Sequence, residues 1–200
     1  MSAQPAHLLV ADVLAWRSWL AAHHHEQDGV WLALAKKGVS EPTSLTYEQA
    51  LEEALCHGWI DGQVRRNDER TYRQRFTPRR ARSPWSKRNV AIVERLQAEE
   101  RMHPAGLAAV AAAKADGRWQ AAYAGAATIE VPADLATALR KEPRAKAMFE
   151  ILTSQNRYAV LYRIAGARRE ETRARHIKRF VAMLARGETP YPQKRKLDAG

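Results

Sequence analysis

Apolar residues near the start of the chain recur with a helical period and then give way to a short apolar run. Asp12 precedes such a periodic segment, which predicts an amphipathic helix from Asp12 to about His25. Gly29 is expected to end this helix. The run VWLALAKK at 30–37 has the length and apolar content of a buried strand. A polar loop through Gly38 then separates this strand from the next helical segment.

That next segment carries signals at both of its ends. Thr46 and Gln49 form a capping-box pattern before ALEEALCH, and Gly58 supplies a stop. The spacing therefore predicts a helix between Thr46 and Gly58.

Beyond Gly58 the period changes from helical to alternating. WIDGQVRR and RTYRQRFTP alternate with period two around Asn67-Asp68, which predicts an antiparallel hairpin. The predicted inner face carries Ile60, Val64, Tyr72, Gln74 and Phe76. The predicted outer face carries Trp59, Asp61, Gln63, Arg65, Arg73 and Arg75. The outer face is thus expected to be a polar, arginine-rich sheet surface.

Helical signals dominate the rest of the chain. Ser83-Pro84 predicts a helix start after a basic loop, and Pro104 opens an alanine-rich helix to about Asp116. Further helices are predicted to begin at Pro132, at Pro143, at Thr153 with its capping partner Asn156, and at about Glu170, the last one ending near Arg186.

Together these elements predict an α+β fold, in which N-terminal helices pack on a small antiparallel sheet with a basic hairpin and an all-helical C-terminal module follows. We expect an α+β domain over 1–118, a linker over 119–131, the helical module over 132–187 and a flexible basic tail over 188–200. Length and apolar content allow a real core, as one large or two small domains.

Charge is concentrated in the hairpin and the loop after it. Residues 65–88 hold ten Arg or Lys against two acids, a local +8 in a chain whose formal net charge is +11. Such a balance favours anionic partners, although net charge alone selects none of them. The lone Cys56 fits a reducing compartment, and the chain shows neither a membrane-spanning apolar run nor a secretory leader pattern, so we expect a cytoplasmic protein.

Several long motifs point to a known family. ALCHGWIDGQVRR, YRQRFTPRRARSPWSKRN, MHPAGL and LTSQNRYAVLYRIAGARREETRARHIKRFVAML occur in that order. From Trp16 to Pro192 the chain resembles the YdeI/OmpD-associated family, also described as bacteriocin-protection proteins. The resemblance implies an α+β N-terminal part, a helical C-terminal module and an association with stress or bacteriocin protection in bacteria. It implies no particular reaction.

The hairpin and the loop after it form the main candidate site. Arginine forks bind phosphate or carboxylate, tryptophans offer stacking surfaces, and the expected helix start at Ser83 to Ser86 adds free backbone N–H groups. The alternative is a solvated basic loop over ordinary core tryptophans. The candidate ligand-binding residues are Trp59, Asp61, Arg65, Arg73, Arg75, Arg79, Arg80, Trp85, Ser86, Asn89 and Arg173.

Arg173 belongs to this set because it lies one turn before Ile177 on the apolar stripe of the last helix. An inward arginine requires an acidic partner or an anionic ligand. We expect its guanidinium either to pair with an acid of the N-terminal half or to point into a cleft between the halves.

Catalytic and metal-binding alternatives are less favoured by the pattern. Cys56 and His57 are adjacent at the end of a helix and point about 100° apart, so the thiol and the imidazole are not expected to face each other, even with Asp61 nearby. The consecutive residues His23, His24 and His25 diverge on a helix and lack further ligands. We therefore predict no catalytic residues, no metal and no cofactor.

Three functions remain open at this point. The first is a non-enzymatic cytoplasmic protein that binds an anionic small molecule or an acidic protein segment. The second is backbone-directed, salt-sensitive binding of nucleic acid, which draws on the same arginines without a recognisable nucleic-acid motif. The third is an enzyme for a phosphorylated or carboxylated substrate, for which no nucleophile or base stands out. No oligomeric state follows from the sequence.

Overall fold

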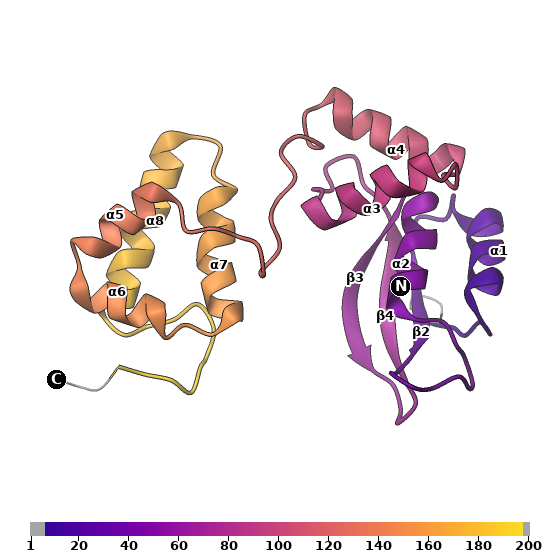
Figure 1. Cartoon of the computed structure of the whole chain (residues 1–200), viewed down its shortest axis with the longest axis horizontal. Coiled ribbons are helices and arrows are strands. Elements are labelled where there is room, and N and C mark those ends of the chain that lie inside the picture. The colour runs from indigo at the N-terminus through magenta and orange to yellow at the C-terminus, as the bar shows by residue number, and fades with distance from the viewer. Residues whose placement is uncertain (1–6, 198–200) are drawn as a thin grey trace, which may run out of the picture. The chain divides into compact units, whose positions relative to one another are not determined.

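A computed structural model describes residues 7–197 of the protein. It divides into two compact units, Met1–Ala122 and Tyr123–Gly200. Within the described residues all four strands lie in the first unit, together with helices α1 to α4, and the second unit holds helices α5 to α8 (Figure 1). The predicted α+β class is confirmed.

The sheet of the first unit is built around the predicted hairpin. Its strands are β1 (His7–Leu8), β2 (Val30–Ala35), β3 (Trp59–Arg66) and β4 (Thr71–Pro78), in the spatial order β1-β2-β4-β3. β4 pairs antiparallel with β3, as the predicted hairpin requires, and it also pairs antiparallel with β2, whereas β1 pairs parallel with β2. The hairpin tip lies at the end of the sheet farthest from α3 and α4 (Figure 1).

Two helices begin where their capping residues predict. Asp12 accepts a hydrogen bond from the Ala15 N–H at 2.9 Å and caps α1 (Val13–His23). Thr46 and Gln49 form the reciprocal capping box of α2 (Tyr47–Cys56). Gly58 follows α2 with φ +76°, a conformation that a glycine adopts without steric cost.

The start of α3 (Lys87–Ala98) corrects the prediction of a helix beginning at Ser83-Pro84. The Ser83 hydroxyl accepts a hydrogen bond from the Arg80 N–H at 2.9 Å and so closes a turn before the helix. Ser86 is the capping residue instead, since its hydroxyl accepts from the Asn89 N–H at 3.1 Å. The free N–H groups of the helix start therefore lie three residues later than expected. α4 (Pro104–Ala115) begins at the predicted proline.

The core of the first unit lies between the four helices and one face of the sheet. Trp16 and Leu20 of α1 pack with side chains of α2 and with the inward-facing residues of the strands. Burial of large apolar side chains, each worth roughly 1.5–3 kcal/mol, is the main stabilising contribution to such a fold. The inward-facing strand residues of this core are Val30, Leu32, Leu34, Trp59 and Phe76.

The second unit is a helical module with its own core. It contains α5 (Ala133–Arg140), α6 (Pro143–Glu150), α7 (Ser154–Ala165) and α8 (Glu170–Ala185). The predicted cap of α7 is confirmed, because the Thr153 hydroxyl accepts from the Asn156 N–H at 3.3 Å. Apolar stripes from all four helices form the core, including Leu135, Met148, Leu161, Phe180 and Leu184.

The described part of the predicted flexible tail is anchored to α7. The buried Asn156 side chain donates to the Tyr191 carbonyl at 3.0 Å and to the Gln193 side chain at 2.9 Å, and it accepts from the Tyr191 N–H at 2.8 Å. Residues 198–200 lie outside the described part. No helix within 7–197 has the length and hydropathy needed to cross a bilayer.

Candidate functional site

The two faces of the sheet differ in what covers them. Even-numbered positions of β2 and β4 face the helices and form the core, whereas Trp31, Arg73 and Arg75 face the other way. Arg65 of β3 pairs with Arg73 and so lies on the same outer face. The predicted shared face of the three arginines is therefore confirmed by the strand register. We call Arg65, Arg73, Arg75 and Trp31 the arginine face.

A β-bulge excludes Trp59 and Asp61 from this face and corrects the prediction that they share it. The register of β3 against β4 shifts between Asp61 and Val64. The buried Gln74 side chain donates to the Gly62 carbonyl at 2.9 Å and to the Gln63 carbonyl at 3.3 Å, which holds the extra residue in place. Since one inserted residue reverses the alternation, the two segments of β3 present opposite faces.

On the inner side both excluded residues have structural partners. The Trp59 ring is fully buried, and its Nε1–H donates to the His24 carbonyl at 2.9 Å. Asp61 accepts a hydrogen bond from the Tyr47 hydroxyl at 2.9 Å. Burial of Tyr47 and the neighbouring Asp61 charge raise the pKa of this hydroxyl above its usual range, so it remains a donor.

The centre of the arginine face is a tryptophan covered by guanidinium groups. The Arg65 guanidinium lies 4.3 Å from the Trp31 ring centroid, and that of Arg75 lies 5.8 Å from it. The Trp31 ring is only 3% exposed as a result. Arg75 also donates to the Asp28 carbonyl at 2.6 Å. These contacts hold two planar cations over one ring, with Arg65 exposed to solvent.

Within the described residues, the positive charge of Arg65 and Arg73 on this face is not neutralised by an ion pair. The side chains of Arg65 and Arg73 form no hydrogen bond or ion pair with any residue between 7 and 197. Asp68 lies at the hairpin tip, but its carboxylate accepts bonds from the Thr71 N–H at 2.7 Å and from the Arg70 N–H at 2.8 Å. Those bonds lower the pKa of Asp68, and the bond from the Thr71 N–H has the largest effect.

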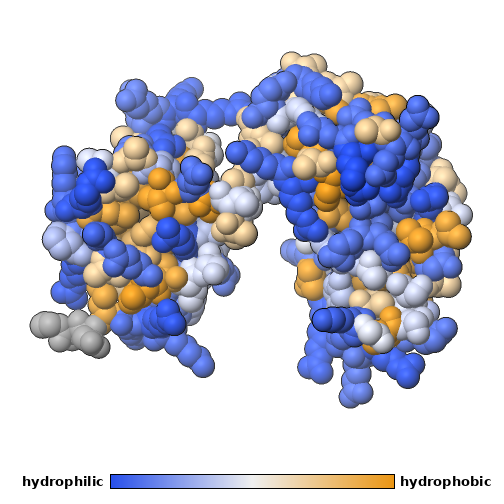
Figure 2. Space-filling view, in the orientation of Figure 1, coloured by the Kyte–Doolittle hydropathy of each residue, from blue (hydrophilic) through white to orange (hydrophobic). Residues whose placement is uncertain are grey.

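Two hollows adjoin the arginine face and share Trp31 and His7. The larger has a volume of about 650 Å³ and the smaller about 240 Å³. Hydrophilic side chains dominate the visible surface around the hairpin tip (Figure 2). The larger hollow is lined by His7, Trp31, Gly62, Gln63, Arg65, Arg75 and Thr77. The smaller is lined by His7, Leu8, Leu9, Trp31, Ala33, Pro42, Asn67, Asp68, Thr71 and Arg73.

The second half of the predicted site, around Trp85, is part of the folded core. The Arg79 guanidinium lies 3.5 Å from the Trp85 ring centroid, and Trp119 packs on the same ring with centroids 4.8 Å apart. Trp85 is 2% exposed, so a ligand has no free ring face to stack on. The predicted stacking role of Trp85 is therefore wrong.

The neighbours of Trp85 have other roles in the structure. Ser86 caps α3 through its bond with the Asn89 N–H, and Asn89 is itself buried. Arg79 donates to the Pro84 carbonyl at 3.2 Å, while the Arg80 side chain is exposed. None of these four residues lines either hollow beside the arginine face.

Arg173 has an acidic partner, but within its own unit. Its Nε and Nη2 atoms donate to the Asp134 carboxylate at 2.6 and 3.0 Å, and Nη1 donates to the Ile164 carbonyl at 3.0 Å. The bond to Arg173 lowers the pKa of Asp134. The expectation of an acid from the N-terminal half is thus wrong. The acidic partner of Arg173 is Asp134, which lies in the first turn of α5 within the second unit.

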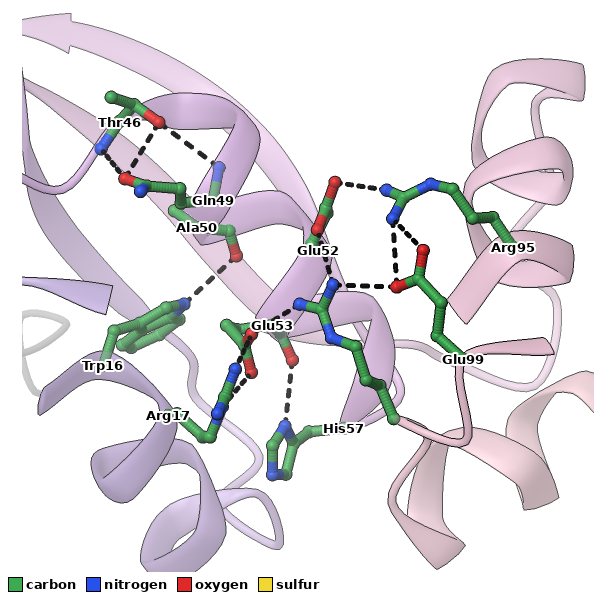
Figure 3. A network of polar contacts seen from close by, with 11 residues as sticks. Trp16, Arg17, Thr46, Gln49, Ala50, Glu52, Glu53, His57, Arg95 and Glu99 are labelled. Carbon is green, nitrogen blue, oxygen red and sulfur yellow. Dashed lines mark hydrogen bonds and ion pairs between the residues drawn. The ribbon is translucent and has the colours of Figure 1, made fainter. Parts of the chain in front are cut away.

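A second charged cluster joins α1, α2 and the segment between α3 and α4. The Glu53 carboxylate, 3% exposed, accepts bonds from Arg17 at 2.7 and 2.9 Å and from Arg101 at 2.9 Å (Figure 3). Burial raises the pKa of Glu53, but the bonds from both arginines outweigh it and leave the pKa below its usual value. Arg95, Glu52 and Glu99 extend the network (Figure 3).

Cys56 and His57, next to this network, are poorly placed for nucleophilic chemistry. Burial and the neighbouring Glu53 charge raise the pKa of the Cys56 thiol to about 11, which disfavours the thiolate. His57 Nδ1 donates to the Glu53 carbonyl at 2.9 Å and stacks on His103 with centroids 4.8 Å apart. Within residues 7–197 no group of three or more His, Cys, Asp or Glu is arranged to hold a metal ion.

The tryptophan at the centre of the arginine face was missed by the sequence prediction. Trp31 belongs to VWLALAKK, whose continuous apolar pattern predicts burial on both faces of the strand. Alternation along that strand does place Trp31 and Ala33 on one face, but only the pairing with β4 shows that this face is the arginine-rich one. His7 was missed because β1 has two residues.

Two family models match the chain. Residues 8–109 match the model described as "Domain of unknown function (DUF8412)", and residues 128–187 match the one described as "Bacteriocin-protection, YdeI or OmpD-Associated". The second match confirms the resemblance over the helical module, while the hairpin motifs lie within the first. Comparisons with curated proteins and with solved structures gave no match.

Proposed function

The chain belongs to the family of the domain of unknown function DUF8412 and carries a YdeI/OmpD-associated module after it, and we propose that it is a cytoplasmic binding protein whose arginine face captures a phosphate- or carboxylate-bearing ligand. The observation that supports this most is that the side chains of Arg65 and Arg73 form no hydrogen bond or ion pair with the described residues, although each lines a hollow. Like charges that lie close together repel one another, so an anion bound between these arginines lowers their electrostatic energy.

The shape of the larger hollow fits this proposal. Its volume of about 650 Å³ lies within the range of about 300–1,000 Å³ that small-molecule sites occupy. Arg65 and Arg75 supply forked donors for an anionic group, and Gln63 and Thr77 supply neutral hydrogen-bonding groups at the margin. Trp31 beneath the arginines fixes their planes, which reduces the entropy lost on binding.

Binding is favoured over catalysis by the chemistry of the side chains. The arginine face provides charge and hydrogen-bond donors, while the only thiol of the chain lies in the core with a raised pKa. A single free cysteine is consistent with a reducing compartment, which supports the cytoplasmic part of the proposal.

The direct test is calorimetric titration and thermal-shift measurement with inorganic pyrophosphate and with citrate. A ligand that binds only the folded state raises the melting temperature by mass action. We expect stabilisation by at least one of these anions, reduced at least fivefold in affinity by Arg65→Ala and by Arg75→Ala.

Arg66→Ala is the matched control. Arg66 follows Arg65 on the same strand, is exposed, and pairs with Tyr72, so it projects to the opposite face of the sheet. If Arg66→Ala and Arg65→Ala weaken binding equally, the effect comes from net charge and the proposed site is wrong.

A further inference from the structure

The arginines of the sheet face are divided between two adjoining hollows rather than gathered around one point. Arg65 and Arg75 line the larger hollow, Arg73 lines the smaller, and Trp31 and His7 line both. From Thr77 to Thr71, β4 runs beside both hollows over six residue steps, or about 20 Å of extended strand. A single small anion fills one hollow, whereas a linear polyanion reaches the cations of both.

From this arrangement we propose that the polyanion is single-stranded nucleic acid, held through its phosphates along β4 with its bases against the arginine face. This inference rests on the proposed function and names the ligand class of the same site. Arg73 and Arg75 are two residues apart on one strand, so their backbone positions are about 6.6 Å apart, and Arg65 is one strand away at about 4.8 Å. Each guanidinium therefore serves a different phosphate along an extended strand.

Planar groups favour a nucleic acid over an acidic peptide. The Arg65 guanidinium already lies on the Trp31 ring at 4.3 Å, and its other side is exposed to solvent. Unpaired bases stack on arginine planes as well as on aromatic rings, and such stacking is sequence-tolerant. Gln63 and Thr77 beside the larger hollow can donate and accept hydrogen bonds, as base edges and sugar hydroxyls require.

The position and lining of the larger hollow also disfavour an acidic peptide as the ligand. An extended peptide is usually recognised by pairing with a strand edge, with pockets for alternate side chains. The larger hollow instead lies on the face of the sheet, and its lining is polar apart from Trp31 and Gly62. This lining suits phosphates and bases better than the side chains of a peptide.

The experiment measures the anisotropy of a labelled 12-nucleotide oligothymidylate and of the matching oligouridylate with the full-length protein, at several salt concentrations. Three phosphate contacts to a single strand give a slope of log K against log salt of about −2, hence roughly a 20-fold loss of affinity between 50 and 200 mM salt. Arg73→Ala is expected to weaken binding about tenfold and to reduce the slope by about 0.7.

Matched controls separate the site from general basicity. Arg66→Ala, on the opposite face, and Arg175→Ala, in the second unit, each remove one exposed charge and are expected to change the affinity less than twofold. Equal losses for Arg66→Ala and Arg73→Ala overturn the inference. So does equal affinity for a 12-base-pair duplex, or for a polyglutamate peptide of the same charge.

The outcomes also separate this inference from the proposed function. Arginine-dependent binding of pyrophosphate, with no tighter binding of the oligonucleotides, overturns nucleic-acid recognition and leaves anion binding intact. Loss of both kinds of binding refutes both. Melting temperatures within about 2 °C of the wild-type value show that the variants are folded.

Discussion

Two groups of arginines in the first unit meet opposite electrostatic conditions. Arg17 and Arg101 converge on the buried carboxylate of Glu53, whereas Arg65 and Arg73 share the outer sheet face without an acidic partner among the described residues. The first group has its charge neutralised by the fold itself. On the proposed function, the second retains its charge for an anion that is not part of the chain. Under that proposal, pairing rather than the number of arginines separates structural from ligand-binding charge in this protein.

The largest expected effect breaks the paired group. Glu53→Ala leaves the partly exposed Arg17 and Arg101 without the carboxylate that joins α1, α2 and the segment after α3. We expect the free energy of unfolding to fall by about 3 kcal/mol, at the low end for a broken buried pair because both arginines keep some contact with water. Urea denaturation measures it.

Two further measurements serve as controls for Glu53→Ala. Arg17→Ala should cost less than Glu53→Ala, because Arg101 still compensates the carboxylate at 2.9 Å. Pyrophosphate affinity of the folded Glu53→Ala protein should match that of the wild type. A loss below about 1 kcal/mol for Glu53→Ala would show that the network contributes little to stability.

Arg173→Ala tests a paired arginine at higher exposure. Its side chain is 28% exposed and that of Asp134 44%, so the ion pair itself is worth up to about 1 kcal/mol, and the bond to the Ile164 carbonyl adds a similar amount. We expect a loss of about 1–2 kcal/mol in the unfolding of the helical module, followed by circular dichroism. Asp134→Asn should reproduce only part of it. Lost anion binding with unchanged stability would return Arg173 to the ligand site.

Acidification should protonate two neighbouring histidines of the first unit, His57 and His103. Cations would then lie side by side without counter-charge, as they do on the arginine face. The His103 ring lies 4.7 Å from His24 and 4.8 Å from His57 between centroids. Burial lowers the pKa of His57, with His103 and His24 adding to this effect, and burial followed by His24 lowers the pKa of His103. The His57 and His103 rings are therefore best accommodated when neutral.

The sign of the pH dependence follows from these shifts. The unfolded histidines titrate near a pKa of about 6.5, above the folded values, so the unfolded state binds more protons over this interval. Stability should be complete above pH 7 and fall as the pH drops through about 6.5, by up to about 1.4 kcal/mol per pH unit for the buried His57 and by less for the more exposed His103, until the folded pKa is reached. Denaturation at pH 7.5, 6.5 and 5.5 measures it, and His103→Gln should flatten the curve.

Much of the fold was predictable because its signals are local. The capping oxygens of Asp12, Thr46 and Thr153 lie within three residues of the N–H groups they bind, so the sequence contains both partners of each bond. Hairpin alternation is equally local. The start of α3 was misplaced because Ser83 and Ser86 are both capable caps, and the turn that occupies Ser83 depends on Arg80.

The candidate site was predictable only in part because its assembly is not local. Alternation placed Arg65, Arg73 and Arg75 together correctly, but the bulge at Gly62 and Gln63 depends on the amide of Gln74 across the hairpin. That contact reverses the face of Trp59 and Asp61. Trp31 reaches the arginines through pairing of β2 with β4, which joins segments about forty residues apart in the chain.

The smallest expected effect belongs to the unpaired arginines. Arg73→Ala removes a side chain that has no hydrogen bond or ion pair with the described residues, and it relieves repulsion from Arg65 directly across the hairpin. We therefore expect the free energy of unfolding to change by less than about 0.5 kcal/mol, or to increase slightly in low salt, where the repulsion is least screened. Urea denaturation at 20 and 500 mM salt measures both conditions. A loss of more than about 1 kcal/mol would mean that Arg73 is held by the fold after all, and the distinction between paired and unpaired arginines would then no longer identify the site.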